Sequence, residues 1–152
     1  MSLVGGHDGT TYDYLEVADA LAQHGATVAA DLAQLGLRIA FLRAVHNTDN
    51  HPRNHRFLRA RAGWSLSPAF DLIPSPDPRA EPVTSIGFAA GPRAARREAM
   101  LACARNFGLS PQVANERLTT VTACVRNWRQ VAASFDIRAD EQDLFTDCSE
   151  SE

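Results

Sequence analysis

The sequence predicts a mainly α-helical domain with a small β-hairpin, and three observations support this prediction. Apolar residues recur at helical spacing through residues 12–45 and again through residues 93–135. Between these two parts, a polar stretch at residues 46–55 precedes two short runs with the character of strands. The chain has 152 residues and is 45% hydrophobic, which suits one domain with its own core.

The first part of the chain predicts two helices. One covers residues 12–24 and ends at Gly25. The second covers residues 27–45 and is apolar on most of its circumference, so we expect it to be the buried, central helix. Its main apolar face consists of Val28, Leu32, Leu35, Ile39 and Leu42. Gly36 costs this helix about 1 kcal/mol relative to Ala, and indicates a close contact or a break.

The middle of the chain predicts a hairpin followed by a loop. Residues 56–60 and 63–67 form the two strands, with a tight turn between them. Residues 68–82 hold five of the eight prolines and are therefore a loop. Residues 83–89 form a further short strand or loop.

Two more helices are expected after the loop. The first covers residues 93–107 and ends at Gly108. The second covers residues 111–135, with Ser110 as its cap and Pro111 at its first position. An apolar seam at 3-4 spacing predicts that this long helix packs against other helices: Leu118, Val121, Val125, Trp128 and Phe135.

Composition excludes several classes of protein. No apolar run is long enough to span a membrane. The three cysteines are widely spaced, which excludes a zinc ribbon or disulfide scaffold and indicates the reducing cytoplasm. A net charge of -3 argues against nucleic-acid binding by the chain. All 15 basic residues are arginine, so a phosphate-binding Walker lysine and a Schiff-base lysine are both excluded.

Charge is distributed unevenly and suggests how the chain is divided. Residues 55–135 are basic, with 11 arginines, whereas residues 136–152 hold seven acidic residues and one arginine. We interpret residues 1–3 as an expression leader, residues 4–137 as the folded domain and residues 138–152 as an acidic tail. Such a tail is solvated or docks on a basic surface.

Three polar residues around the predicted hairpin suggest chemistry. Asp49 and Asn54 lie five residues apart in the polar stretch, and Asp71 follows the second strand. A phosphoryl-transfer site needs an Asp that orients the nucleophile, an Asn five residues later on Mg²⁺, and a second Asp on Mg²⁺ from a separate strand-turn. Taken singly, each residue also suits a structural role, in an Asx turn or a turn cap.

Two motifs carry a family resemblance. Residues 47–58, N-T-D-N-H-P-R-N-H-R-F-L, resemble the catalytic segment of HipA-like kinases, approximately N-T-D-D-H-x-[KR]-N-h-x-F-L. Residues 66–74, L-S-P-A-F-D-L-I-P, are similar to their L-S-P-A-[YF]-D-[LI]-x-P segment. The resemblance implies the helical C-terminal lobe of a protein-kinase-like fold, with ATP- and Mg²⁺-dependent serine/threonine kinase activity. Members of that family are typically toxins paired with a DNA-binding antitoxin.

The resemblance also implies roles for individual residues. Asp49 would be the catalytic base, and Asn54 and Asp71 would bind Mg²⁺. Residues on both segments would line the ATP phosphates and the metal: His51, Pro52, Arg53, Asn54, Phe70, Asp71, Leu72 and Ile73. Asn50 stands where the family often has a second Asp, which lowers the charge near the metal.

A kinase N-lobe would bring strands, a glycine-rich loop and a phosphate-binding lysine. The residues before Asp49 are predicted to be helical, and the chain has no lysine. We therefore expect a truncated kinase that is inactive alone and whose partners are a missing N-lobe and a protein substrate. Exposed apolar surface would also favour dimerisation of the isolated lobe.

Two alternatives come from other classes of function. His46, His51 and His55 are possible ligands of a zinc or metal-nuclease site. A non-enzymatic interaction module would instead use an arginine-rich surface on the later helices, formed by Arg93, Arg96, Arg97 and Arg105.

Overall fold

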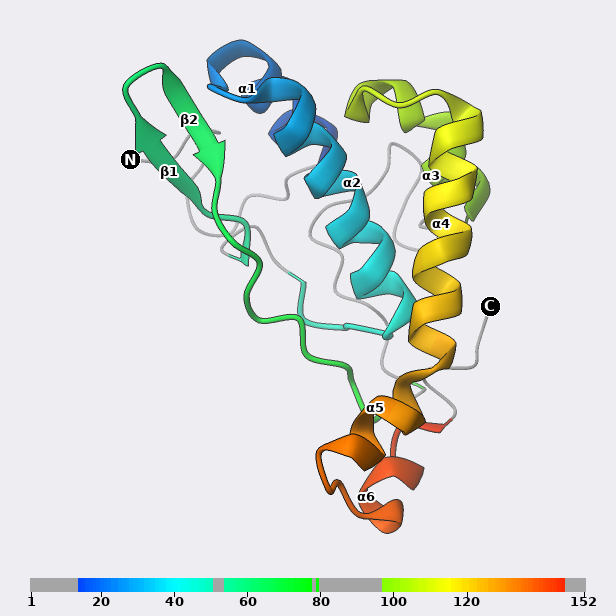
Figure 1. The fold of residues 1–152 in the computed structure, drawn as a ribbon. Coiled ribbons are helices and arrows are strands. Elements are labelled where there is room, and N and C mark those ends of the chain that lie inside the picture. Colours follow the sequence, from blue (N-terminus) through cyan, green and yellow to red (C-terminus); the bar gives the residue numbers. More distant parts are fainter. Residues whose placement is uncertain (1–13, 51–53, 78, 80–96, 147–152) are drawn as a thin grey trace.

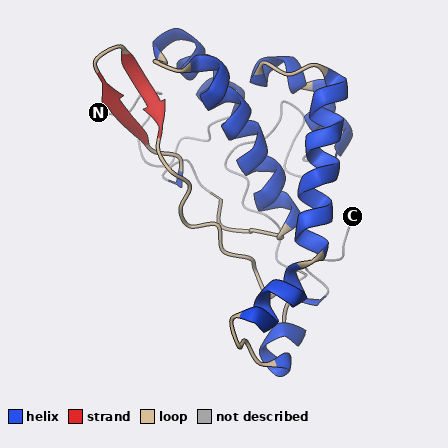
Figure 2. Ribbon diagram, in the orientation of Figure 1, coloured by secondary structure: helices blue, strands red, loops and turns tan. Residues whose placement is uncertain are grey.

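The computed structural model describes residues 14–50, 54–77, 79 and 97–146. Its elements are α1 (Tyr14–His24), α2 (Val28–Ala44), β1 (Phe57–Ala60), β2 (Gly63–Leu66), α3 (Arg97–Ala102), η2 (Ala104–Phe107), α4 (Pro111–Arg126), α5 (Trp128–Ser134) and α6 (Ala139–Asp143). Figure 2 shows that helices dominate and that the two strands form one hairpin. The predicted fold class, mainly α with a small hairpin, is confirmed.

Helix α2 lies at the centre of the core, as its apolar circumference predicts. It contacts α1 and β2 as well as η2 and α4 (Figure 1). Leu35 is fully buried and Ile39 is 4% exposed. Full burial of such a side chain stabilises the fold by about 1.5–3 kcal/mol. The helix is one residue shorter at each end than predicted, because Thr27 and Val45 are its caps.

The close contact expected at Gly36 is confirmed. The side chain of Phe107, from η2, packs directly on this point of α2. A Cβ added to Gly36 would lie 3.5 Å from the Phe107 Cβ, which is an ordinary van der Waals contact. The Phe107 ring therefore packs against α2 at Gly36, and the helix is not interrupted there.

The hairpin is confirmed, and it docks on the turn between α1 and α2. Its strands are antiparallel, with Phe57 opposite Leu66. The Ala26 N–H donates to the Trp64 carbonyl at 2.7 Å. Gly63, at the start of β2, has φ 149°, and a Cβ there would lie 2.6 Å from the His24 carbonyl oxygen. Only glycine fits this close approach without a backbone shift.

The expected continuous helix over residues 93–107 is wrong in its second half, and residues 93–96 lie outside the described part. Helix α3 ends at Ala102, and the chain tightens into the 3-10 turn η2 after Cys103. Residues three apart align on one face of a 3-10 turn. This places both Ala104 and Phe107 in the core, where they are 2% and 4% exposed.

The single long helix expected over residues 111–135 is also wrong. Its start is confirmed, because Ser110 caps α4 by accepting a hydrogen bond from the Val113 N–H at 3.3 Å. The helix breaks at Asn127, a poor helix former whose N–H turns back to the Cys124 carbonyl at 3.2 Å. The apolar seam therefore does not stay in the core to its end, and its last residue, Phe135, is 76% exposed.

Beyond the break, α5 and α6 lie at the far end of α4 from α3 (Figure 1). The acidic residues 138–146 form α6 and its flanks, and Asp143 makes an ion pair with Arg129 at 3.2 Å. The predicted strand or loop at residues 83–89 lies outside the described residues. None of the helices in the described ranges has the length and apolar character needed to cross a membrane.

Candidate active site

The polar loop after α2 begins with a left-handed cap. His46 has φ 51°, and its N–H donates to the Arg43 carbonyl at 3.0 Å. The next N–H, of Asn47, donates to the Leu42 carbonyl at 2.8 Å. This pair of bonds is the Schellman motif, which usually places glycine at the left-handed position. The cap turns the chain off the helix axis, so that Asn47 is buried immediately after α2.

Two segments that are distant in sequence run side by side at the candidate site. We call residues 46–56 the loop segment and residues 67–75 the return segment. Three hydrogen bonds connect them: Ser67 N–H to Arg56 O at 2.9 Å, Asn47 Nδ2–H to Ile73 O at 2.7 Å, and Ser75 N–H to His46 O at 3.2 Å. The bonds lie at both ends of the two segments, and the described parts of the segments can be followed in Figure 1.

The three residues predicted to carry the chemistry lie on these connected segments. Asn54 is buried, and its Nδ2 donates to the Asp49 backbone carbonyl at 3.2 Å. This bond leaves the amide oxygen of Asn54 as the atom that can bind a metal ion. The carboxylate-bearing residues Asp49 and Asp71 are both exposed. Asp71 has φ 58°, a conformation that Asp tolerates better than most residues.

The other predicted site residues are distributed around Asp71. Phe70 is half-buried beneath the Arg56 guanidinium, whose central carbon lies 5.1 Å from the ring centroid. Leu72 is half-buried, whereas Ile73 is 64% exposed. His51, Pro52 and Arg53 lie outside the described residues.

A buried polar network joins the loop segment to α1. Asn50 Nδ2 donates to the Tyr14 hydroxyl oxygen, and His55 Nε2 lies 3.2 Å from Asn50 Oδ1 and 3.3 Å from that hydroxyl. The Tyr14 and His55 rings also make an edge contact with centroids 5.3 Å apart. Burial raises the pKa of Tyr14 well above its usual range. The network fixes the loop segment on either side of the region that holds Asn54.

Sequence reasoning missed this network. Tyr14 is one apolar position of an amphipathic helix, and nothing local in the sequence connects it to residues 36 and 41 positions later. The only signal was the unexplained density of polar residues in the loop.

The zinc alternative stays a prediction, because His51 is outside the described residues. The structure does show that His55 Nε2 takes part in the network with Tyr14 and Asn50. Within the described ranges, no three or more His, Cys, Asp or Glu side chains gather around a common metal position. Mg²⁺ needs fewer protein ligands, since it keeps waters and binds phosphate oxygens. An Asn54 amide oxygen and an Asp71 carboxylate fit that preference.

Arg38, on α2, holds the beginning of the return segment. Its side chain is only 8% exposed, and its Nη2 donates to the Ser67 carbonyl. Nε and Nη1 are buried and have no hydrogen-bond partner among the described residues. Burial lowers the pKa of Arg38, and the negative charge of Asp31 opposes this effect. Burying a guanidinium is costly, and the hydrogen bond to the Ser67 carbonyl offsets part of that cost. The bond therefore fixes Ser67, at the start of the return segment, against α2.

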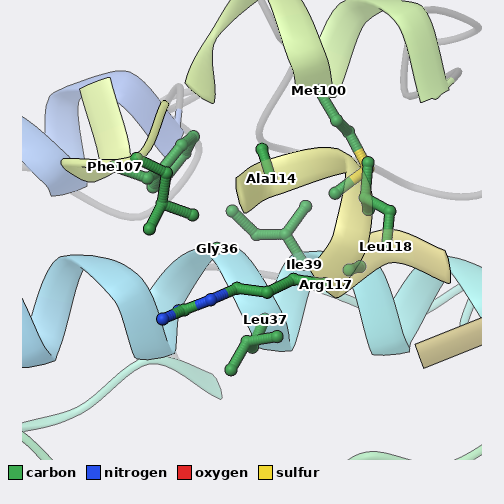
Figure 3. A pocket seen from close by; sticks show the side chains of 10 residues that line it. Gly36, Leu37, Ile39, Met100, Phe107, Ala114, Arg117 and Leu118 are labelled. Carbon is green, nitrogen blue, oxygen red and sulfur yellow. The ribbon is translucent and has the colours of Figure 1, made fainter. Parts of the chain in front are cut away.

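A pocket lies away from these polar contacts, between α2, α3, η2 and α4. It is lined almost entirely by apolar side chains (Figure 3): Gly36, Leu37, Ile39, Ala40, Met100, Phe107, Leu109, Ala114, Arg117 and Leu118. Arg117 is the one charged residue in this lining. None of the described residues that line this pocket carries a carboxylate.

The arginine-rich surface of the alternative interaction module is partly described. Arg97 donates to Asn115 Oδ1 at 2.8 Å and to Thr119 Oγ1 at 2.7 Å, which clamps α3 onto α4. This arginine therefore has a structural role. Arg105 is exposed, and Arg93 and Arg96 lie outside the described residues.

Comparison with known proteins identifies one family. The HipA-like C-terminal domain matches residues 1–128, which include both connected segments and end where α5 begins. No curated protein and no solved structure matches the chain.

Proposed function

Because the chain belongs to the HipA-like C-terminal domain family, we propose that it is the helical C-terminal lobe of a serine/threonine protein kinase. The observation that supports this proposal is the pairing of the loop segment with the return segment through three hydrogen bonds. Phosphoryl transfer needs a base and metal ligands from two separate stretches of chain at one place. The paired segments bear Asp49 and Asn54 on one side and Asp71 on the other.

Each residue has a distinct role in the proposed reaction. Asp49 accepts the proton of the attacking serine or threonine hydroxyl, and its exposure leaves it open to a protein substrate. Asn54 and Asp71 hold the metal through their side-chain oxygens. When bound, Mg²⁺ neutralises charge on the transferring phosphates. Residues 51–54 and 70–73 line the phosphates.

We propose that a second lobe completes the ATP site. The sequence has no lysine, so the lysine that usually binds the α- and β-phosphates would come from that second lobe. Alone, the chain would bind Mg·ATP only through exposed contacts. We expect a dissociation constant no better than about 1 mM, near -4 kcal/mol, and little kinase activity. By family, the assembled kinase acts in the cytoplasm as a toxin controlled by a DNA-binding antitoxin.

The test is radiolabelled phosphate transfer by a protein that contains both lobes. Asp49→Asn keeps the size of the side chain but removes the base, so transfer falls by about 100-fold or more. Asp77→Asn is the matched control, because Asp77 is also an exposed loop Asp and its carboxylate accepts a hydrogen bond from the Arg79 N–H, at 2.9 Å. Circular dichroism should show that the native protein and both variants have the same fold. Undiminished transfer by Asp49→Asn would remove Asp49 from its role.

A further inference from the structure

Two arginines of the hairpin region lie over aromatic rings at nearly the same distance. The guanidinium carbon of Arg56 lies 5.1 Å from the Phe70 ring centroid, and that of Arg59 lies 5.2 Å from the Trp64 centroid. Both arginines are exposed. They differ in what lies next to them in the sequence.

Arg56 is close to the candidate metal ligands along both segments. It follows Asn54 by two residues, and its ring partner Phe70 directly precedes Asp71. The hydrogen bond from the Ser67 N–H to the Arg56 carbonyl fixes the backbone of Arg56 against the return segment. Arg59 instead lies on β1, opposite Trp64, in the outer half of the hairpin.

The charge of Arg56 is not neutralised within the described part of the protein. The ion pairs there involve other arginines, Arg129 and Arg138, and no described carboxylate is paired with Arg56. A guanidinium stacked on a ring keeps its N–H groups in its own plane, where they can donate to phosphate oxygens. In a chain without lysine, an arginine must supply any such cation.

We propose that Arg56 is a phosphate-binding residue of the nucleotide site, held in place by Phe70. This inference rests on the proposed function and names a contact that the two family motifs do not assign. The ligand is the polyphosphate chain of Mg·ATP. Arg56 donates hydrogen bonds to its oxygens while Asn54 and Asp71 hold the metal.

The experiment is an NMR titration of the chain with inorganic tripolyphosphate in the presence of Mg²⁺, with adenosine as a ligand that lacks phosphate. Arg56→Gln removes the charge and is expected to weaken tripolyphosphate binding about 10-fold, which corresponds to about 1.4 kcal/mol. Arg59→Gln, the matched control, should change it less than twofold. Arg56→Lys restores the charge and should recover most of the affinity. Any signal changes with adenosine should be the same in all variants.

Equal affinities for the native chain and Arg56→Gln would overturn the inference. An equal loss in Arg59→Gln would also overturn it, since the effect would then be one of net charge. The Asp71→Asn variant distinguishes failure of the Arg56 inference from failure of the proposed function. If Asp71→Asn abolishes the Mg²⁺-dependent part of binding but Arg56→Gln has no effect, only the role of Arg56 fails. If neither substitution matters, the proposed site fails as well.

Discussion

The side of the molecule that carries the candidate site and the side formed by α2, η2 and α4 are held together by different forces. Around the site the buried groups are largely polar: Arg38, Asn47, Asn50, Asn54, His55 and Ser67. Between α2, η2 and α4 they are apolar, as with Ile39 and Phe107. Apolar packing is non-directional and contributes most stability, whereas hydrogen bonds fix groups at particular positions. The apolar side therefore stabilises the fold, and the polar side positions the loop segment and the return segment.

The largest expected effect is on the apolar side. Leu35 is fully buried in α2, so Leu35→Ala removes apolar burial and leaves a cavity in the core. We expect a loss of about 3 kcal/mol in the free energy of unfolding, measured by urea denaturation. Leu144→Ala is the control, since Leu144 is 62% exposed and its truncation should change stability by less than about 0.5 kcal/mol. Similar losses in both variants would contradict a core centred on α2.

An intermediate effect is expected from breaking the polar network. Tyr14→Phe keeps the ring that contacts His55 but removes the oxygen to which Asn50 donates. The expected loss of stability is about 1–2 kcal/mol, because a buried amide loses this acceptor. Amide hydrogen exchange should quicken in the loop segment more than in α4. Uniform acceleration across the molecule would show that the network stabilises the whole fold rather than positioning the loop.

The same hydroxyl predicts a pH dependence. Its pKa is higher in the folded protein than the usual value of about 10, so folding favours the protonated form. The contribution of the protonated Tyr14 hydroxyl to the free energy of unfolding is present in full below pH 10. It is lost as the pH rises from there towards the pKa of the folded protein. The native protein should therefore lose more stability than Tyr14→Phe as the pH rises from about 10 to about 12. Parallel curves for the two proteins would contradict this.

The smallest effect is expected to be a gain. Gly36→Ala adds a methyl group in ordinary contact with Phe107 and raises the helix propensity of α2. Stability should rise by about 0.5–1 kcal/mol, seen as a higher midpoint of thermal unfolding. A decrease would mean that the Phe107 ring is seated more closely on α2 than these distances indicate.

The sequence predicts the elements that depend on local signals. The apolar circumference of α2 identifies the central helix, and Ser110 with Pro111 marks the start of α4. The break at Asn127 was not predicted, because the spacing of apolar residues continues through it and only its tertiary surroundings show that Phe135 is exposed. Similarly, η2 forms because Ala104 and Phe107 both enter the core, which is a tertiary requirement.

The candidate site is predictable to a similar extent. Its motifs place Asp49, Asn54 and Asp71 on two segments, but they do not show what connects those segments. The return segment is held by groups outside the predicted site, Arg38 on α2 and Asn47 on the loop segment, whose partners are backbone carbonyls 29 and 26 residues away. Backbone carbonyls carry no sequence signal, so contacts of this kind emerge only from the fold.

We propose that Asn54 and Asp71 bind one metal ion, and paramagnetic NMR of this chain with Mn²⁺ can show whether they do. Mn²⁺ binds the same oxygen ligands as Mg²⁺ and broadens the signals of nearby amides. We expect substoichiometric Mn²⁺ to broaden the signals of amides around Asn54 and around Asp71 together, in Asp77→Asn as in the native chain. Asp71→Asn should abolish the broadening in both segments. Broadening confined to one segment, or to the acidic residues 138–146, would contradict it.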